Sequence, residues 1–193
     1  MAKTVVLVCV LLAACCTAHA TMIDLSTFFF FADGKVTFSS GGTVATFVES
    51  AGHPETLLSD NPLMGDPELI FAGPGVWLQF DYVFTEGPTE GTSANKDEFG
   101  AWIIDPVSGW SVGAPYEVFR QDTDSGTVSF DLSSLSSTAP WGLQFQLSSL
   151  PEDSGTGSTL RISNVQLVPE PITVVALGSL LVGIFTARCL KRD

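Results

Sequence analysis

The chain has 193 residues, of which 45% are hydrophobic, and it carries a formal net charge of −13. An acidic surface of this kind repels nucleic acid and anionic lipid, so a nucleic-acid-binding function is not expected. The length allows one domain of moderate size together with short terminal segments.

Residues 1–20 predict a signal peptide and therefore export. Lys3 supplies the positive start, residues 4–14 are almost wholly apolar, and Ala18-His19-Ala20 fits a small-residue cleavage site. Leu12-Ala13-Ala14-Cys15 also fits the lipoprotein pattern, in which a lipidated Cys15 would begin the mature chain. Cleavage after Ala20 is the preferred interpretation, and lipidation of Cys15 stays open.

The segment from residue 21 to 168 lacks cysteine, because Cys9, Cys15, Cys16 and Cys189 all lie outside it. An exported domain without disulfides is stabilised by core burial alone, and a domain of ~150 residues buries roughly 68–70% of its unfolded surface. The segment holds four basic and 19 acidic residues. Solubility explains most of that excess, and divalent-cation binding is the sharper alternative.

The apolar pattern of this segment alternates with a period of two, which is typical of half-buried strands. Residues 76–84 and 141–147 show the alternation most clearly. The predicted strands cover residues 35–38, 43–49, 68–71, 76–84, 99–104, 116–121, 128–132, 141–147 and 159–168. No segment before residue 172 has helical periodicity, so the sequence predicts an all-β, antiparallel β-sandwich.

The last predicted strand changes phase along its length. Leu160 and Ile162 alternate, Asn164 interrupts, and Val165 and Leu167 resume one residue later. A β-bulge at Ser163-Asn164 would return the apolar side chains to one face.

One candidate ligand face combines an aromatic ring with amides. Trp77, Gln79 and Asp81 lie opposite the apolar face of their strand, and Gln144 and Gln146 do the same in theirs. If the two strands share a sheet, a ring would lie among amide donors and acceptors, which suits the CH face and hydroxyls of a sugar. The alternative is that Trp77 packs under a loop and the glutamines only face water.

Asp122 and Asp124 form the candidate metal site. They precede Gly126 with the one-residue spacing of calcium loops, although the third acid and terminal glutamate of an EF-hand are absent. Lys96-Asp97-Glu98-Phe99 is a second acidic segment and an alternative site for calcium. Two acids in a hairpin turn are also common without metal. No other cofactor is expected, since His53 is the only histidine of the segment and zinc prefers nitrogen and sulfur ligands.

Catalytic motifs are weak. Gly109-Trp110-Ser111-Val112-Gly113 matches G-x-S-x-G, but that motif needs a helix after the serine, and here Ala114-Pro115 and a strand follow. His53 also precedes Ser111, against the usual order of a hydrolase triad. No spacing selects a pair of carboxylates for glycosidase chemistry. The sequence therefore favours a protein that is not an enzyme.

The C-terminus predicts an anchor. Pro169-Glu170-Pro171 precedes sixteen mostly apolar residues, 172–187, and Arg188, Lys191 and Arg192 follow. At about 1.5 Å per residue a helix over 172–187 would span roughly 24 Å, slightly less than a hydrocarbon core. The cations would stay cytoplasmic and leave the preceding domain outside. The alternative is a buried C-terminal core helix.

This ending resembles the PEP-CTERM sorting signal of bacterial exported proteins, over residues 168–193. The resemblance rests on three features: Pro169-Glu170-Pro171, the apolar segment, and the basic end with Arg188, Lys191 and Arg192. It implies an exosortase-like membrane enzyme as partner, a precursor anchored in the inner membrane, and a mature protein at the cell surface or outside the cell.

Residues 129–133 and 161–167 also resemble strands of the jelly-roll sandwich found in carbohydrate-binding-module-like domains. That resemblance implies a jelly-roll-like body between residues 21 and 168 and hints at extracellular polysaccharide as a partner. We expect a non-catalytic surface or matrix protein with weak glycan contact. A secreted polysaccharide hydrolase and a purely structural, self-associating surface protein are the alternatives.

Overall fold

The computed structural model describes residues 20–31, 35–49, 55–64, 70–88, 96–148 and 157–169. Residues Thr21–Leu167 form one compact unit, and a second unit comprises Met1–Ala20 with Val168–Asp193. Only Ala20, Val168 and Pro169 of the second unit are described. No helix in the described ranges is long and apolar enough to cross a membrane. The predicted signal peptide, apart from Ala20, and the apolar segment 172–187 lie outside those ranges.

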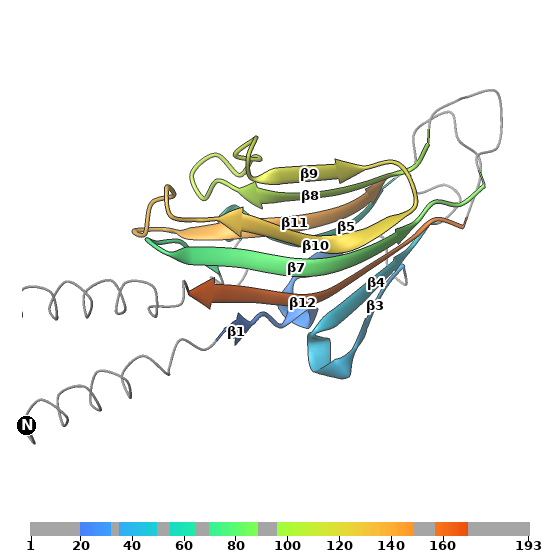
Figure 1. Ribbon diagram of the computed structural model, residues 1–193, viewed down its shortest axis with the longest axis horizontal. Coiled ribbons are helices and arrows are strands. Elements are labelled where there is room, and N and C mark those ends of the chain that lie inside the picture. The colour runs from blue at the N-terminus through green and yellow to red at the C-terminus, as the bar shows by residue number, and fades with distance from the viewer. Residues whose placement is uncertain are drawn as a thin grey trace, which may run out of the picture. The chain divides into compact units, whose positions relative to one another are not determined.

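The compact unit is all-β and consists of two antiparallel sheets (Figure 1). Sheet A has the strand order β10 (Asp124–Asp131), β7 (Val76–Thr85), β12 (Thr159–Pro169), β4 (Val44–Val48) and β3 (Val36–Ser39), with β1 (Thr21–Met22) paired to β12. Sheet B has the order β2 (Phe29–Phe31), β5 (Glu55–Asp60), β11 (Pro140–Ser148), β8 (Glu98–Ile104) and β9 (Glu117–Arg120), with β6 (Ile70–Phe71) paired to β11. The 3-10 helices η1 (Leu25–Thr27), η2 (Ser40–Gly42) and η3 (Pro62–Met64) lie between strands.

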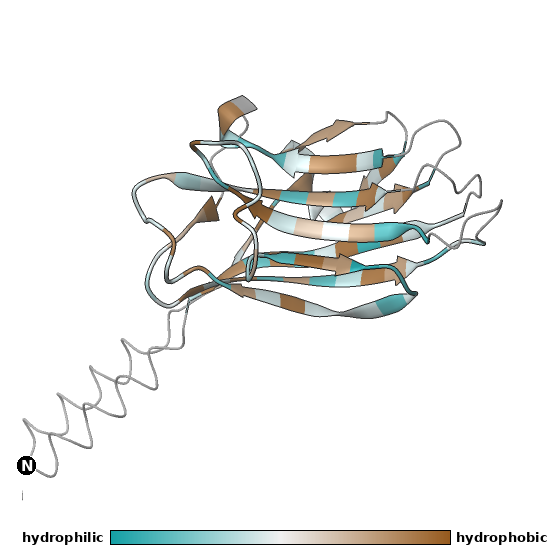
Figure 2. Ribbon diagram, turned by 90° about the horizontal axis from the view of Figure 1, so that it is seen from above, coloured by the Kyte–Doolittle hydropathy of each residue, from teal (hydrophilic) through white to brown (hydrophobic). Residues whose placement is uncertain are grey.

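Alternating side chains of both sheets build the core, and the hydropathy changes along the strands accordingly (Figure 2). In β7 the side chains of Leu78, Phe80 and Phe84 are fully buried, as the sequence pattern predicts. Phe80 joins the two layers, because its ring centroid lies 6.0 Å from that of Phe130 in sheet A and 5.1 Å from that of Phe145 in sheet B. Both contacts are edge-to-face, the geometry that aromatic pairs prefer.

The predicted phase change in β12 is confirmed. Leu160, Ile162 and Val165 are all fully buried, although Ile162 and Val165 are three residues apart. Asn164 between them has a φ of 54°, in the left-handed region that asparagine tolerates better than most residues. At this point β12 changes partner, because Ser163 still pairs with Val44 of β4. Beyond it, β12 pairs with β1.

Two strands of sheet B were not predicted, and each has a visible reason. In β5 the buried positions include the polar residues Thr56 and Asp60 beside Leu58, so the inward face is not apolar. In β2 three consecutive phenylalanines give no alternation at all. β10 also begins at Asp124, earlier than predicted, so part of the expected acidic turn belongs to a strand.

Strands β7 and β11 lie in different sheets, which corrects one premise of the sequence analysis. Residues 76–84 and 141–147 both alternate cleanly, but alternation gives only the face of a strand and not its neighbours. Trp77 and Gln144 therefore cannot contribute to one sheet face.

Candidate functional site

Trp77, Gln79 and Asp81 lie on the outer face of sheet A, where they alternate with core residues of β7. The Asp81 carboxylate is already bonded, since Thr127 Oγ1 and Asn164 Nδ2 each donate to it at 2.6 Å. These two hydrogen bonds hold the pKa of Asp81 below its ordinary value, and the bond from Thr127 has the larger effect. Asp81 thus links β7 to β10 and β12. Because both of its carboxylate oxygens already accept hydrogen bonds from the protein, Asp81 is less accessible to a ligand than the sequence suggests.

Gln144 and Gln146 lie on the outer face of sheet B, and strand pairing places them at the centre of two rows that cross the strands β2, β5, β11, β8 and β9. Through successive pairings the first row runs Phe29, Ser59, Gln144, Trp102, Glu117. The second row runs Phe31, Leu57, Gln146, Gly100, Phe119. Neighbouring strands lie ~4.8 Å apart, so each row extends roughly 19 Å. We call these ten residues the aromatic–amide face.

Trp102 and Phe119 provide its largest aromatic surface. Their ring centroids are 6.0 Å apart and the ring planes are tilted by 32°. Both rings lie over Gly100, because a Cβ added to that glycine would come within 2.7 Å of Trp102 Cζ3 and 3.1 Å of Phe119 Cε1. The missing side chain therefore lets the two rings rest on the backbone of β8 as one broad apolar surface.

The glutamines form a chain of amides along β11. Gln144 Nε2 donates to Gln146 Oε1 at 3.4 Å, and Gln146 Nε2 donates to Ser148 Oγ at 2.6 Å. Each amide carries two N–H donors and an oxygen with two lone pairs, so both glutamines keep free capacity for a ligand. Both side chains are half-buried, which fixes their positions while leaving them accessible.

Phe29 and Phe31 border the opposite side of the face. They are 54% and 55% exposed, whereas Phe30 between them packs against the core. Of the ten residues of the aromatic–amide face only Glu117 is charged, and none is basic. The face therefore offers apolar rings and neutral hydrogen-bonding groups and has no cation to attract an anionic ligand.

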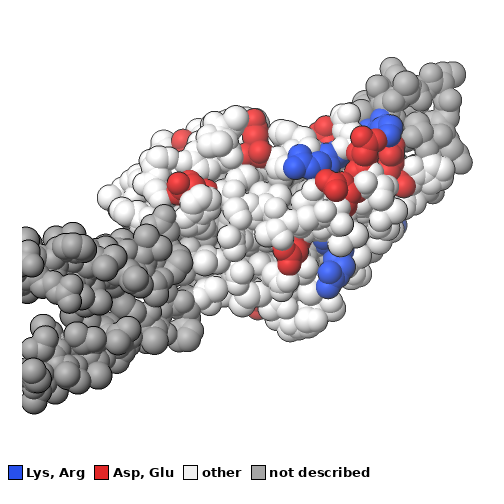
Figure 3. All heavy atoms as spheres, in the orientation of Figure 1, with Lys and Arg blue, Asp and Glu red and all other residues white. Residues whose placement is uncertain are grey.

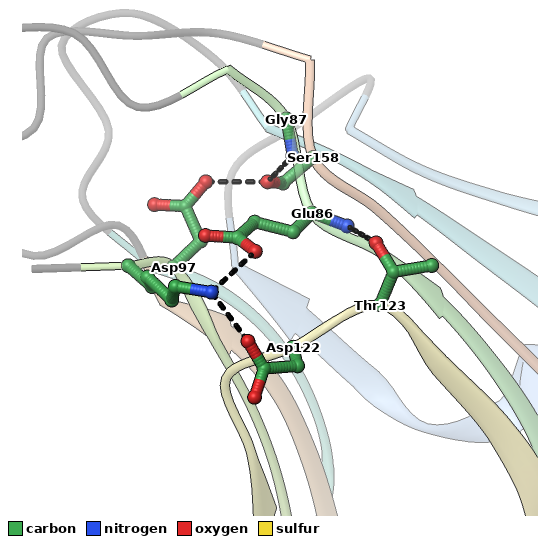
Figure 4. Close-up of polar contacts among 7 residues, drawn as sticks. Glu86, Gly87, Asp97, Asp122, Thr123 and Ser158 are labelled. Carbon is green, nitrogen blue, oxygen red and sulfur yellow. Dashed lines mark hydrogen bonds and ion pairs between the residues drawn. The ribbon is translucent and has the colours of Figure 1, made fainter.

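Acidic and basic side chains gather together at one end of the sandwich (Figure 3). Asp122 lies close to Glu86 and Thr123 (Figure 4), and Asp124 begins β10 two residues later. Asp122 makes an ion pair with Lys96, whose Nζ also lies 3.3 Å from Glu86 Oε2. These two contacts raise the pKa of Lys96, and the contact with Asp122 has the larger effect. Within the described residues no cluster of three or more His, Cys, Asp or Glu side chains could hold a metal. Calcium at Asp122 and Asp124 stays a prediction.

Asp124 belongs to a separate set of contacts. Tyr82 donates its hydroxyl to Asp124 Oδ2 at 2.6 Å, and Arg120 Nε lies 3.4 Å from the same oxygen. The hydrogen bond from Tyr82, followed by that from the Ser125 N–H, lowers the pKa of Asp124. The pKa of Tyr82 is raised, mainly by burial and then by its bond to Asp124. These carboxylates thus already interact with protein cations and donors.

Ser158 organises the same end of the molecule. Its hydroxyl donates to Asp97 and accepts the Gly87 N–H (Figure 4). Its own N–H donates to Glu49 Oε2 at 3.0 Å. Ser158, Asp97 and Glu49 are all at least nine-tenths buried. The network joins the ends of strands from both sheets, which is a structural role.

Ser111 lies in the segment between β8 and β9, and the structure describes every residue of this segment. No helix follows Ser111 there. Its hydroxyl donates to Glu117 Oε2 at 3.3 Å, and the Gly113 N–H donates to it at 3.0 Å. This turn lacks the strand–turn–helix context of a nucleophile elbow. His53 lies outside the described residues.

Sequence reasoning missed Trp102, Phe119, Phe29 and Phe31. The alternation of residues 99–104 contained the signal, because Phe99, Ala101 and Ile103 face the core and Trp102 must face outward. Of the predicted sorting signal only Pro169 is described, as the last residue of β12. Glu170, Pro171, Arg188, Lys191 and Arg192 lie outside the described residues.

No family model matches the chain, and no curated protein matches it. Among solved structures it is similar to TmCBM61 in complex with β-1,4-galactotriose, with a TM-score of 0.44, 12% identity, and coverage of 76% of this chain and 91% of that chain. It is also similar to an apo cyclase from Fischerella sp., with a TM-score of 0.39 and 12% identity, and the match covers 80% of this chain and 88% of that chain. A third similar structure is a family 16 carbohydrate binding module-2, with a TM-score of 0.36 and 11% identity, and this match covers 67% of this chain and 78% of that chain. All three TM-scores lie below 0.5, so we infer no function from these structures.

Proposed function

We propose that this chain is an exported, non-catalytic surface or matrix protein that binds a neutral glycan through the aromatic–amide face. The observation that carries the proposal is the arrangement of Gln144 and Gln146 between two groups of aromatic rings on one sheet face. A sugar presents apolar CH faces and many hydroxyls, so it needs a flat ring and neutral donors and acceptors together. Trp102 and Phe119 supply the ring surface, and the two amides supply the polar groups.

The charge of the face supports a neutral ligand. Its only charged residue, Glu117, would repel uronic-acid or sulfated polysaccharides, and no arginine or lysine lies among its ten residues.

The connection of the strands supports describing the body as jelly-roll-like. The chain passes repeatedly from one sheet to the other between successive strands.

Export and anchoring belong to the same proposal. A signal peptide over residues 1–20 and a PEP-CTERM-like tail over residues 169–193 would deliver the body beyond the cytosol. The lack of cysteine between residues 21 and 168 is compatible with that location, because the fully buried aromatic and aliphatic core provides the stabilisation.

The test compares two tryptophans on opposite outer faces. Affinity electrophoresis of the full-length chain in detergent, in gels containing neutral polysaccharides such as β-1,4-galactan, measures retardation of the wild type. Trp102→Ala should abolish retardation, whereas Trp77→Ala should leave it unchanged. Retardation that survives Trp102→Ala and disappears in Trp77→Ala would move the site to sheet A and contradict the proposal.

One observation favours self-association as a second candidate function. β2 is an edge strand of sheet B, and Phe29 and Phe31 expose more than half of their surface there. Exposed apolar edge strands pair readily with another chain. Sedimentation velocity of the wild type and of the Phe29→Ser, Phe31→Ser double variant separates the two candidate functions. An oligomer that the wild type forms with rising concentration and that the variant does not form supports self-association. A wild type that is monomeric at all concentrations excludes it.

A further inference from the structure

The loop between β8 and β9 exposes the two most accessible large apolar side chains of the described residues. Val107 is 83% exposed and Trp110 is 78% exposed. A tryptophan so accessible is unusual, because this side chain is normally buried to a large extent. The proposed face does not include either residue.

This loop is held in one shape by its own hydrogen bonds. Asp105 Oδ1 accepts from the N–H groups of Val107 and Ser108, and the Asp105 carbonyl accepts the Gly109 N–H at 2.8 Å. The Asp105 N–H in turn donates to the Trp110 carbonyl at 2.9 Å. The exposed apolar side chains therefore sit on a pre-organised turn, which lowers the entropic cost of binding a ligand.

The loop adjoins one end of the aromatic–amide face. Ser111 forms a bridge to Ile104 and donates its hydroxyl to Glu117, the last residue of the row that contains Trp102. Ile104 alternates with the core residue Ile103 and so faces outward, yet it is only 1% exposed. The loop and its neighbours thus cover the outer face at this position and form its border.

η3 completes that border. A Cβ added to Gly109 would lie 2.8 Å from Leu63 Cδ1, and one added to Gly142 would lie 3.0 Å from Pro62 Cδ. Leu63 is itself 54% exposed. Leu63, Val107 and Trp110 therefore belong to two adjoining segments at the end of the face, and we call them the loop patch.

Because the loop patch adjoins the aromatic–amide face, we propose that Trp110 is a second aromatic contact for the glycan. The ligand is then an extended neutral chain long enough to reach from Trp102 to the loop patch. The inference rests on the proposed function of the aromatic–amide face. A short oligosaccharide would occupy that face alone. A longer chain would continue past Glu117 and gain a stacking surface at Trp110.

The test measures binding against chain length. Isothermal titration of the full-length chain uses β-1,4-galacto-oligosaccharides and β-1,4-gluco-oligosaccharides, from disaccharide to hexasaccharide. The wild type should bind the longest chains about ten-fold more tightly than the shortest, and Trp110→Ala should remove that gain while leaving the affinity for short chains unchanged. Trp102→Ala should weaken binding at every length. Val83→Ala, an exposed residue of sheet A, is the matched control and should change nothing.

Failure of this inference differs from failure of the proposed function. Equal length dependence in wild type and Trp110→Ala overturns the inference and leaves the face intact as a site. A wild type that binds none of these oligosaccharides contradicts both. Binding to phosphatidylcholine vesicles, or self-association in sedimentation velocity, that Trp110→Ala removes without affecting oligosaccharide binding would assign the loop patch to a membrane or to a second copy instead.

Discussion

Asp81 shows how a residue that looks functional in sequence serves the fold. Its two carboxylate oxygens accept hydrogen bonds from Thr127 of β10 and Asn164 of β12, so one side chain joins three strands. We expect Asp81→Ala to lower the free energy of unfolding by about 1 kcal/mol for each hydrogen bond lost. Urea unfolding of wild type and variant measures the difference, and an unchanged midpoint would show that the bonds contribute nothing.

The same residue predicts a pH dependence. The pKa of Asp81 is lowered in the folded state, so the unfolded chain binds the proton more readily. Its contribution is complete above the unfolded pKa of roughly 3.9 and is lost as the pH falls through the lower folded pKa. Asp81→Asn should therefore lose less stability than wild type between about pH 5 and pH 2. Parallel acid limbs in the two proteins would contradict this.

Gly100 is a residue-scale test of the aromatic–amide face. A Cβ at this position would lie 2.7 Å from Trp102 Cζ3. We expect Gly100→Val to displace the two rings and weaken glycan retention at least ten-fold, while the core beneath stays intact because the face lies outside it. Affinity electrophoresis gives the binding, and near-ultraviolet circular dichroism follows the tryptophan environment. Gly73→Val, where the nearest atom to an added Cβ is Val76 Cγ2 at 3.9 Å, an ordinary contact, is a spatial control.

At the scale of elements, the irregularity in β12 has a defined cost. Asn164 holds a left-handed backbone and also donates to Asp81. Asn164→Val should destabilise the protein by roughly 1–3 kcal/mol, because a β-branched residue is strained at positive φ. Asn164→Gly removes that strain and isolates the lost hydrogen bond, so it should cost less in urea unfolding. Equal losses in the two variants would show that the backbone is not strained.

Phe80 contributes to the contact between the sheets, because it touches Phe130 in its own sheet and Phe145 in the other. Phe80→Ala should lower the free energy of unfolding by about 3–5 kcal/mol through lost burial and the cavity it leaves. Val83→Ala lies on the exposed side of the same strand and should change stability by about 0.5 kcal/mol or less. A small effect of Phe80→Ala would mean that the sheets are not packed through this ring.

Alternation predicted most strands but could not predict their neighbours. β7, β8, β11 and β12 all emerge from the period-two pattern, and even the phase change at Asn164 is legible in the sequence. The pairing of β7 with β10 and β12, and of β11 with β5 and β8, depends on contacts between distant residues. For this reason the sequence places Gln144 and Gln146 beside Trp77 only on the condition that β7 and β11 share a sheet, whereas the structure pairs Gln144 with Trp102 and Gln146 with Gly100.

At the scale of the whole molecule, the ends are expected to determine where the body goes. We expect replacement of Pro169-Glu170-Pro171 by three alanines to block processing, so that the exported chain stays in the inner membrane as an uncut precursor. Fractionation followed by mass measurement of the C-terminus tests this. A mature product identical to that of wild type would remove the sorting signal from the account.

The body itself combines a mainly apolar core with one outer face of rings and amides, and with a second outer face on which Asp81 is bonded to Thr127 and Asn164. The central claim is that the first of these faces binds a neutral glycan. Amide and indole chemical shifts of the labelled chain, recorded by NMR during titration with a retained oligosaccharide, test it most directly. Shifts at Gly100, Trp102, Phe119, Gln144, Gln146 and their neighbours are predicted, joined by Trp110 only when the oligosaccharide is long. Shifts centred on Trp77, Gln79 and Asp81, or none at saturating ligand, would contradict the account.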